Sequence, residues 1–214
     1  MMQRIIQVFL LFSLPISVYS QARSFKTDIP VSKNDQYNMY YNYTQKFQEQ
    51  LSIKPLKNGS EDTVIRIWYD YALFKYKEMY ELSKNNNKWR VTHYAFWTES
   101  QGPSVDRTIT RKQVEAIDPK TSAENLLLQL KKLEIETLPN MNNIPHLSDT
   151  YLDGTSYCFE VSTRSNYRFY TYHLPEKFLE FRQAKLCVAI LNTLEAELDI
   201  KKRQQEIIAL WTKK

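Results

Sequence analysis

The change in hydrophobic period after residue 60 constrains the fold more than any other feature. From Val64 onward the chain is rich in β-branched and aromatic residues. Four apolar side chains alternate here with charged ones, namely Phe74, Tyr76, Tyr80 and Leu82 against Lys75, Lys77 and Glu81. Alternation with a period of two is typical of strands that bury one face. The segment therefore predicts extended strands rather than helices.

A turn and a further strand are predicted after this segment. The run of three asparagines between Lys84 and Lys88 favours a turn, because asparagine tolerates left-handed backbone better than most residues. The following segment, residues 89–97, carries aromatic side chains on both faces. That pattern is typical of a strand in the centre of a sheet or covered on both sides. We therefore expect an antiparallel meander.

Three other segments have helical spacing. The first begins after Asn34 or Asp35, either of which is a good N-cap. Its apolar stripe is expected to lie in the core and consists of Tyr40, Tyr43, Phe47 and Leu51. The second begins at Thr121 or Ser122. The third begins near Glu176 or Lys177, and its predicted buried stripe consists of Leu179, Leu186, Ile190, Leu194 and Leu198.

These patterns together predict an α+β fold. The sheet is expected to be largely antiparallel, built from a meander plus a hairpin, and the N-terminal, middle and C-terminal helices are expected to cover one face of it. Residues 21–33 are polar and are predicted to be a linker. Residues 34–214 are then predicted to form one α+β domain, since the chain is long enough for one core.

The N-terminal residues 1–20 are predicted to be a signal peptide. Arg4 precedes an apolar run from Ile5 to about Val18, and small residues at Val18 and Ser20 suit a cleavage site, with Ser20 and Ala22 as the alternative. We therefore expect export to the periplasm or the exterior. No later segment reaches 18 apolar residues, so the mature chain is expected to lack a transmembrane segment.

Composition argues against several kinds of catalytic or nucleic-acid site. The chain has three glycines, Gly59, Gly102 and Gly154, and none stands in a phosphate-binding loop or a nucleophile elbow. Its three histidines are scattered without metal-ligand spacing. A formal net charge of +5, well mixed along the chain, does not indicate nucleic acid. No cofactor or metal is predicted, and the sequence favours a non-catalytic protein over an enzyme.

The segment 153–176 is predicted to be a hairpin whose register decides its chemistry. A two-residue loop at Ser165-Asn166 would place Cys158 opposite His173, a pair suited to nucleophilic catalysis. A three-residue loop from Arg164 to Asn166 separates charged from apolar side chains better, and we favour it. It would gather four side chains on one face, a candidate surface for a ligand or partner, namely Glu160, Arg168, Tyr170 and Tyr172.

Cys158 and Cys187 are the two cysteines of the chain. An oxidising compartment after export makes them a candidate disulfide, and two buried free thiols are the alternative. A bond between them would tie the hairpin to the C-terminal helix.

Several ordered segments resemble one group of proteins. They are Arg66-Ile67-Trp68, Lys88-Trp89, Leu138-Pro139-Asn140, and Asp153-Gly154 followed by Tyr157, Glu160, Tyr167-Arg168 and Pro175. Their order, over residues 63–176, resembles uncharacterised secreted or envelope proteins of Gram-negative bacteria of the Bacteroidetes type. The resemblance implies an envelope or secreted location and a shared fold. It implies no catalytic residue, cofactor or substrate, because no activity is assigned to that family.

The sequence therefore favours an exported, non-catalytic protein that binds an envelope protein or a glycan. One alternative is a mainly structural domain whose sheet face is covered by its helices. Another is a hydrolase acting on envelope material, with Glu160, His173 and Cys158 as candidate catalytic residues. That alternative requires these three side chains to share a cleft.

Overall fold

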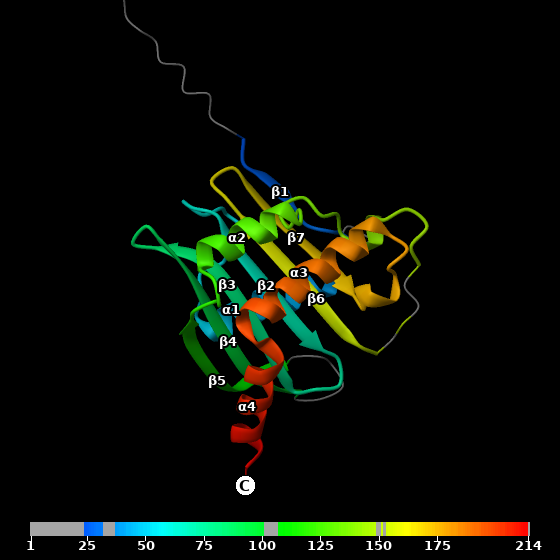
Figure 1. Cartoon of the computed structure of the whole chain (residues 1–214). Helices are drawn as coiled ribbons and strands as arrows, with labels where there is room; N and C mark the ends of the chain where they lie inside the picture. Colours follow the sequence, from blue (N-terminus) through cyan, green and yellow to red (C-terminus); the bar gives the residue numbers. More distant parts are fainter. Residues whose placement is uncertain (1–23, 32–36, 101–106, 149–150, 152, 214) are drawn as a thin grey trace, which may run out of the picture.

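The protein is built on one sheet of seven strands in the order β1-β7-β6-β2-β3-β4-β5 (Figure 1). The computed structural model describes residues 24–31, 37–100, 107–148, 151 and 153–213. The strands are β1 (Lys26–Asp28), β2 (Val64–Tyr71), β3 (Tyr76–Asn85), β4 (Lys88–Ser100), β5 (Arg107–Ile117), β6 (Thr155–Ser162) and β7 (Asn166–His173). The β1–β7 pair is parallel and the other five neighbouring pairs are antiparallel.

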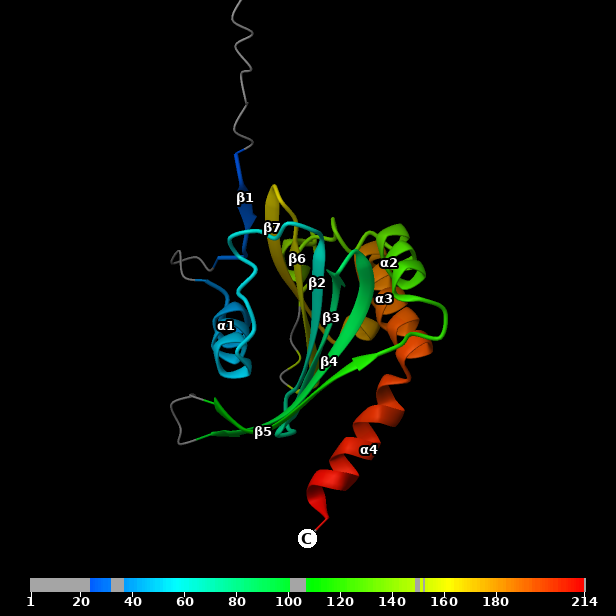
Figure 2. The ribbon, with the colours of Figure 1, turned by 90° about the vertical axis from the view of Figure 1, so that its left-hand side faces the viewer.

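Helices lie on both faces of the sheet. Helix α1 (Met39–Leu51) lies on one side, and α2 (Ala123–Lys132), α3 (Arg182–Leu198) and α4 (Ile200–Thr212) lie on the other (Figure 2). Two 3-10 turns, η1 (Met141–Asn143) and η2 (Pro175–Lys177), flank the hairpin. The predicted combination of helices with a mostly antiparallel sheet is confirmed, whereas the expectation that all helices cover one face is wrong.

Each face of the sheet has its own apolar core. On the α1 side, Tyr41, Phe47 and Leu51 of the helix pack with residues such as Trp68 and Phe96. On the other side, α2 and α3 contribute leucines and isoleucines to a larger cluster that includes Ile65, Tyr80 and Phe159. Because both faces are covered, the central strands carry apolar residues at consecutive positions, as expected for β4.

The first two turns of the meander differ in whether local signals predicted them. Asn86 and Asn87 adopt φ of 49° and 62° between the paired Asn85 and Lys88, which is the two-residue hairpin turn that asparagine favours. The turn between β2 and β3 was not predicted, because the apolar pattern continues through it. Leu73 in that turn is 80% exposed.

The helix boundaries differ from the predicted ones. Helix α1 begins at Met39 after Asn38, whose side chain accepts a hydrogen bond from the Tyr40 amide. The two predicted N-caps, Asn34 and Asp35, lie outside the described residues. The predicted C-terminal helix is two helices, since Asp199 adopts a left-handed conformation between α3 and α4.

The segment predicted to be a linker contains strand β1. Its three residues pair in parallel with Asn166, Tyr167 and Arg168 of β7. The predicted signal peptide, residues 1–20, lies outside the described residues. Among the helices of the described residues, none is both long and apolar enough to cross a membrane.

The β6–β7 hairpin adopts neither predicted register. Glu160 lies opposite Phe169, and Val161 lies opposite Arg168, around a two-residue loop at Arg164-Ser165. The Thr163 hydroxyl fixes this loop by accepting hydrogen bonds from the amides of Ser165 and Asn166. A shift of one residue from the favoured register reverses the faces of one strand relative to the other.

The candidate disulfide is not formed. Both thiols are free and buried. Cys158 belongs to the core on the α1 side, and Cys187 belongs to the core under α3, so the sheet separates them. A disulfide needs its two Cα atoms within roughly 4.4–6.8 Å, which two residues on opposite faces of a sheet do not reach.

We expect both thiols to be inert in the native protein. Burial raises the pKa of Cys158 and of Cys187 well above the usual value, so little thiolate is present for reaction. Ellman's reagent should modify neither cysteine before unfolding and both in denaturant, without prior reduction. Finding fewer than two thiols in unreduced, denatured protein would contradict this arrangement.

Candidate functional site

The predicted surface of Glu160, Arg168, Tyr170 and Tyr172 does not form. Tyr170 and Tyr172 are 1% and 0% exposed and belong to the core that α3 covers. The Tyr170 hydroxyl donates to the carbonyl oxygen of Ile135 at 2.6 Å. These tyrosines are therefore part of the core and could not contact a partner.

Arg168 connects three segments of the fold. Its Nε atom lies 2.8 Å from the Asp28 carboxylate of β1, and its Nη2 donates to the Leu138 carbonyl at 2.9 Å. Its Nη1 donates to the carbonyl of Glu136. The guanidinium thus holds β1 and the loop after α2 against the edge of the hairpin.

Glu160 lies on the opposite face of the sheet from Arg168 and is completely buried under α1. Its carboxylate accepts hydrogen bonds from Gln48 Nε2 at 3.0 Å, Trp68 Nε1 at 2.9 Å and the Tyr167 hydroxyl at 2.7 Å. The Gln48 side chain also accepts from Arg66 Nη1 at 2.9 Å. Glu160 is therefore an anchor for α1, with its acceptors already occupied.

The three candidate catalytic residues of a hydrolase do not share a cleft. They point to the same face, but Glu160 is buried, and Cys158 borders a cavity of about 20 Å³. His173 Nδ1 lies 2.9 Å from Ser156 Oγ instead of contacting either of them. The structure therefore gives no support to catalysis by Glu160, His173 and Cys158.

A groove of about 800 Å³ lies beside the N-terminus of α1. Three segments form it: the connection after β1, the first turns of α1, and the η1 turn. Its lining consists of Asp28, Ile29, Pro30, Val31, Tyr37, Asn38, Met39, Tyr40, Asn42, Tyr43, Asn140, Asn142 and Asn143. We call this hollow the Asn–Tyr groove, since five of its residues are asparagines and three are tyrosines.

Exposed apolar side chains gather at this groove. Val31, Tyr37 and Met39 are 56%, 52% and 56% exposed. Asn142 and Asn143 of η1 are exposed as well. The groove therefore presents aromatic and aliphatic surface next to amide groups that can both donate and accept hydrogen bonds.

Local structure fixes the walls. Asn38 caps α1, and Asn140 Oδ1 accepts hydrogen bonds from the amide and the hydroxyl of Thr171, at 2.8 and 3.0 Å. Asp28, the one charged residue in the lining, is paired with Arg168. The lining therefore carries no unpaired charge.

A hydrogen-bonded chain runs from the groove into the sheet. Tyr40 lies in the wall, and its hydroxyl accepts from Ser156 Oγ at 2.8 Å. Ser156 in turn contacts His173 Nδ1, across the end of the β6–β7 pair. Ser156 is buried and is absent from the lining, so this serine–histidine pair stiffens the wall and is not exposed to a substrate.

Comparison of the chain with protein-family models, curated proteins and solved structures finds no match. Within the part of the chain that the structure describes, no three His, Cys, Asp or Glu side chains are grouped so that they could hold a metal ion.

The groove was not predicted, although its residues are enriched in asparagine and tyrosine in the sequence. Asparagine and tyrosine fill every position except Met39 in Tyr37-Asn38-Met39-Tyr40-Tyr41-Asn42-Tyr43, and asparagine recurs at 140, 142 and 143. Helical spacing assigned Tyr40 and Tyr43 to the core, whereas both are only partly buried and line the groove. The prediction for Phe47 and Leu51 is confirmed, and the buried positions of α1 are Tyr41, Thr44, Phe47, Gln48 and Leu51.

Proposed function

We propose that the protein binds a neutral, hydroxyl-rich ligand, a glycan, in the Asn–Tyr groove. The observation that carries the proposal is the lining itself, with amide groups beside aromatic rings and no unpaired charge over about 800 Å³. This volume lies within the range of ligand-binding pockets.

The chemistry of the lining matches such a ligand. A sugar ring has an apolar face that packs on an aromatic ring, and a rim of hydroxyls that need both donors and acceptors. Tyr37 offers a half-exposed ring, and Asn142 and Asn143 offer amides. A charged ligand would find no unpaired counter-charge in the lining.

Two expectations from the sequence concern the location of the protein in the cell. The predicted signal peptide would bring the groove to the cell envelope or the exterior, where glycans are abundant. The resemblance to secreted proteins of the Bacteroidetes type supports the same setting. In this proposal the protein is a binding protein without catalytic activity.

We expect at least one neutral oligosaccharide to bind in isothermal titration calorimetry. The double variant Tyr37→Ala, Asn142→Ala should have a lower affinity for that oligosaccharide. Loss of one aromatic contact and one hydrogen bond amounts to about 2 kcal/mol, or roughly thirtyfold in affinity. The panel should contain neutral oligosaccharides, anionic oligosaccharides and short peptides.

Asn85→Ala is the matched control, because Asn85 is an exposed asparagine at the end of β3, outside the groove. It should leave affinity unchanged, and circular dichroism should show that every variant is folded. The proposal is wrong if no neutral oligosaccharide binds, if only peptides bind, or if the double variant binds as tightly as the original protein.

A further inference from the structure

A second hollow, of about 410 Å³, lies on the other face of the sheet, at the junction of α3 and α4. The ends of β2 and β6 form its floor, and η2, α3 and α4 form its walls. Its lining consists of Tyr69, Tyr71, Thr155, Tyr157, Glu176, Val188, Leu191, Asn192, Glu195, Ile200, Lys201 and Gln204. We call it the junction pocket. It shares no residue with the Asn–Tyr groove.

Three tyrosine rings make up the aromatic part of this pocket. Tyr69 is central, with its ring centroid 5.2 Å from that of Tyr157 and 6.3 Å from that of Tyr71. The Tyr69–Tyr157 pair is edge-to-face. Neighbouring aromatic faces of this kind attract a cation through the ring quadrupoles.

The Tyr69 hydroxyl is the observation that points to a ligand. Tyr69 is 6% exposed, and its hydroxyl oxygen is buried without a hydrogen-bond partner in the described part of the chain. The Tyr71 hydroxyl, by contrast, donates to Glu78 at 2.5 Å. Buried hydroxyls are nearly always paired in folded proteins. The Tyr69 hydroxyl therefore lacks a partner that a ligand entering the pocket would supply, once the side chains that close this hydroxyl off from solvent move aside.

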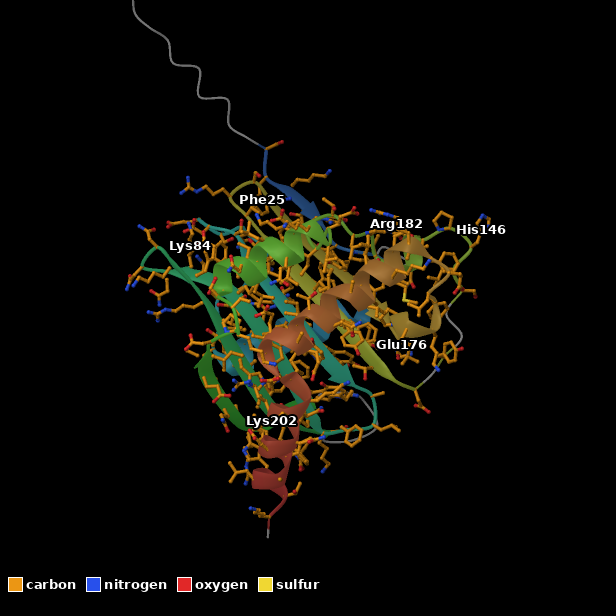
Figure 3. All side chains as sticks on the ribbon, in the orientation of Figure 1. Phe25, Lys84, His146, Glu176, Arg182 and Lys202 are labelled. Carbon is orange, nitrogen blue, oxygen red and sulfur yellow. The ribbon has the colours of Figure 1, made fainter. Side chains whose placement is uncertain are left out.

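Two carboxylates complete the pocket. Glu176 lies beside α3, on the face of the sheet that α3 covers (Figure 3), and Glu195 comes from the last turns of α3. The Glu195 carboxylate accepts a hydrogen bond from the Lys201 amide at 3.1 Å. Among the described residues, neither Glu176 nor Glu195 is in an ion pair with a basic side chain.

Both carboxylates raise the pKa of a tyrosine in the floor of the pocket. Burial, followed by the charge of Glu176, raises the pKa of Tyr157 to about 12. Burial is also the main cause of the raised pKa of Tyr69; the negative charge of Glu78 comes next, and Glu195 contributes less. The tyrosines therefore remain neutral at physiological pH, and the negative charge of the pocket resides on the two glutamates, against the single positive charge of Lys201.

From these contacts we infer that the junction pocket binds a small organic cation, a primary amine or a guanidinium compound. The ammonium or guanidinium group lies between the Glu176 and Glu195 carboxylates and donates a hydrogen bond to the Tyr69 hydroxyl. The methylene groups of the ligand pack on the tyrosine rings and on Val188 and Leu191. Lys201 repels a second positive charge and favours a ligand with one cationic end in the pocket.

The test is calorimetric titration with agmatine, which carries an amine and a guanidinium, and with n-butylamine. Saturable binding of at least one of them is expected. The isosteric Glu176→Gln and Glu195→Gln substitutions should each weaken it about tenfold, since each removes one counter-charge. Tyr69→Phe should weaken it a few-fold through the lost hydroxyl. Glu206→Gln, on the exposed side of α4, is the control and should have no effect.

Two further probes make the outcome decisive. The neutral n-butanol should not bind, and neither should the anion succinate. Equal binding of butylamine and butanol, binding of succinate, no saturable binding of either amine, or unchanged binding in the combined Glu176→Gln and Glu195→Gln variant would each overturn the inference. None of these results depends on the Asn–Tyr groove, and Tyr37→Ala should leave amine binding intact.

Discussion

Replacement of Glu160 by alanine is expected to lower the free energy of unfolding by about 4 kcal/mol. The substitution removes the acceptor of Gln48 Nε2, Trp68 Nε1 and the Tyr167 hydroxyl, and leaves three buried donors without a partner. It also opens a cavity beneath α1, because Glu160 is completely buried. Urea unfolding followed by circular dichroism measures the change, and the melting temperature should fall by roughly 8–16 °C.

Glu134→Ala is the control for this prediction. Glu134 pairs with Arg182 on the surface, where solvent screens the ion pair, so Glu134→Ala should change stability far less than Glu160→Ala does. A loss below 1 kcal/mol for Glu160→Ala would contradict the register of the hairpin. In the register that the sequence favoured, Glu160 lies on the same face as Arg168 and takes no part in holding α1.

Replacement of Glu78 by alanine is expected to have an effect of similar size, about 4 kcal/mol, on the other face of the sheet. Glu78 is completely buried. Its carboxylate accepts from the hydroxyls of Tyr71, Tyr76 and Tyr80 at 2.5, 3.0 and 2.9 Å. The Nε2 atom of His93 lies 3.0 Å away. Alanine leaves these groups without their common partner.

The control for Glu78 is Glu99→Ala, since Glu99 pairs with Lys75 on the surface and its loss should cost less than 1 kcal/mol. Glu78→Gln should fall between the two, because the amide keeps one acceptor oxygen and the volume. Equal stability of Glu78→Ala and Glu99→Ala in urea would show that the tyrosine cluster does not depend on the carboxylate.

The sequence predicted most of the strands because their signals are local. Asparagine at 86 and 87 marked the β3–β4 turn, and Ser122 marked the start of α2, where its hydroxyl accepts from the Asn125 amide at 3.1 Å. The break between α3 and α4 carries no such signal, because Asp199 takes a left-handed conformation that glycine would normally indicate.

The buried face of α1 explains a second error. Apolar spacing predicted Tyr40 and Tyr43 in the core, but Gln48 has to face the sheet, where its amide bridges Glu160 and Arg66. The helix therefore buries Tyr41 and Thr44 and turns Tyr40 and Tyr43 toward the Asn–Tyr groove. A pairing between two residues 112 positions apart in the chain leaves no trace in local periodicity.

The candidate site depended on the hairpin register, which local patterns did not determine. Both predicted loops omitted the hydrogen bonds of the Thr163 hydroxyl to Ser165 and Asn166. The observed register differs from the favoured one by one residue. As a result, Glu160 lies on the α1 face, and Tyr170 and Tyr172 lie in the core under α3. The groove that replaces the predicted surface is assembled from three separate segments, and only the fold brings them together.

Binding of a glycan in the Asn–Tyr groove can be tested directly by an amide chemical-shift titration of the labelled protein with a neutral oligosaccharide from the binding panel. We expect saturable shifts concentrated at residues 37–43 and 140–143, on the two sides of the Asn–Tyr groove, with the junction pocket unaffected. Shifts concentrated elsewhere, or no saturable shifts with any neutral oligosaccharide, would contradict it.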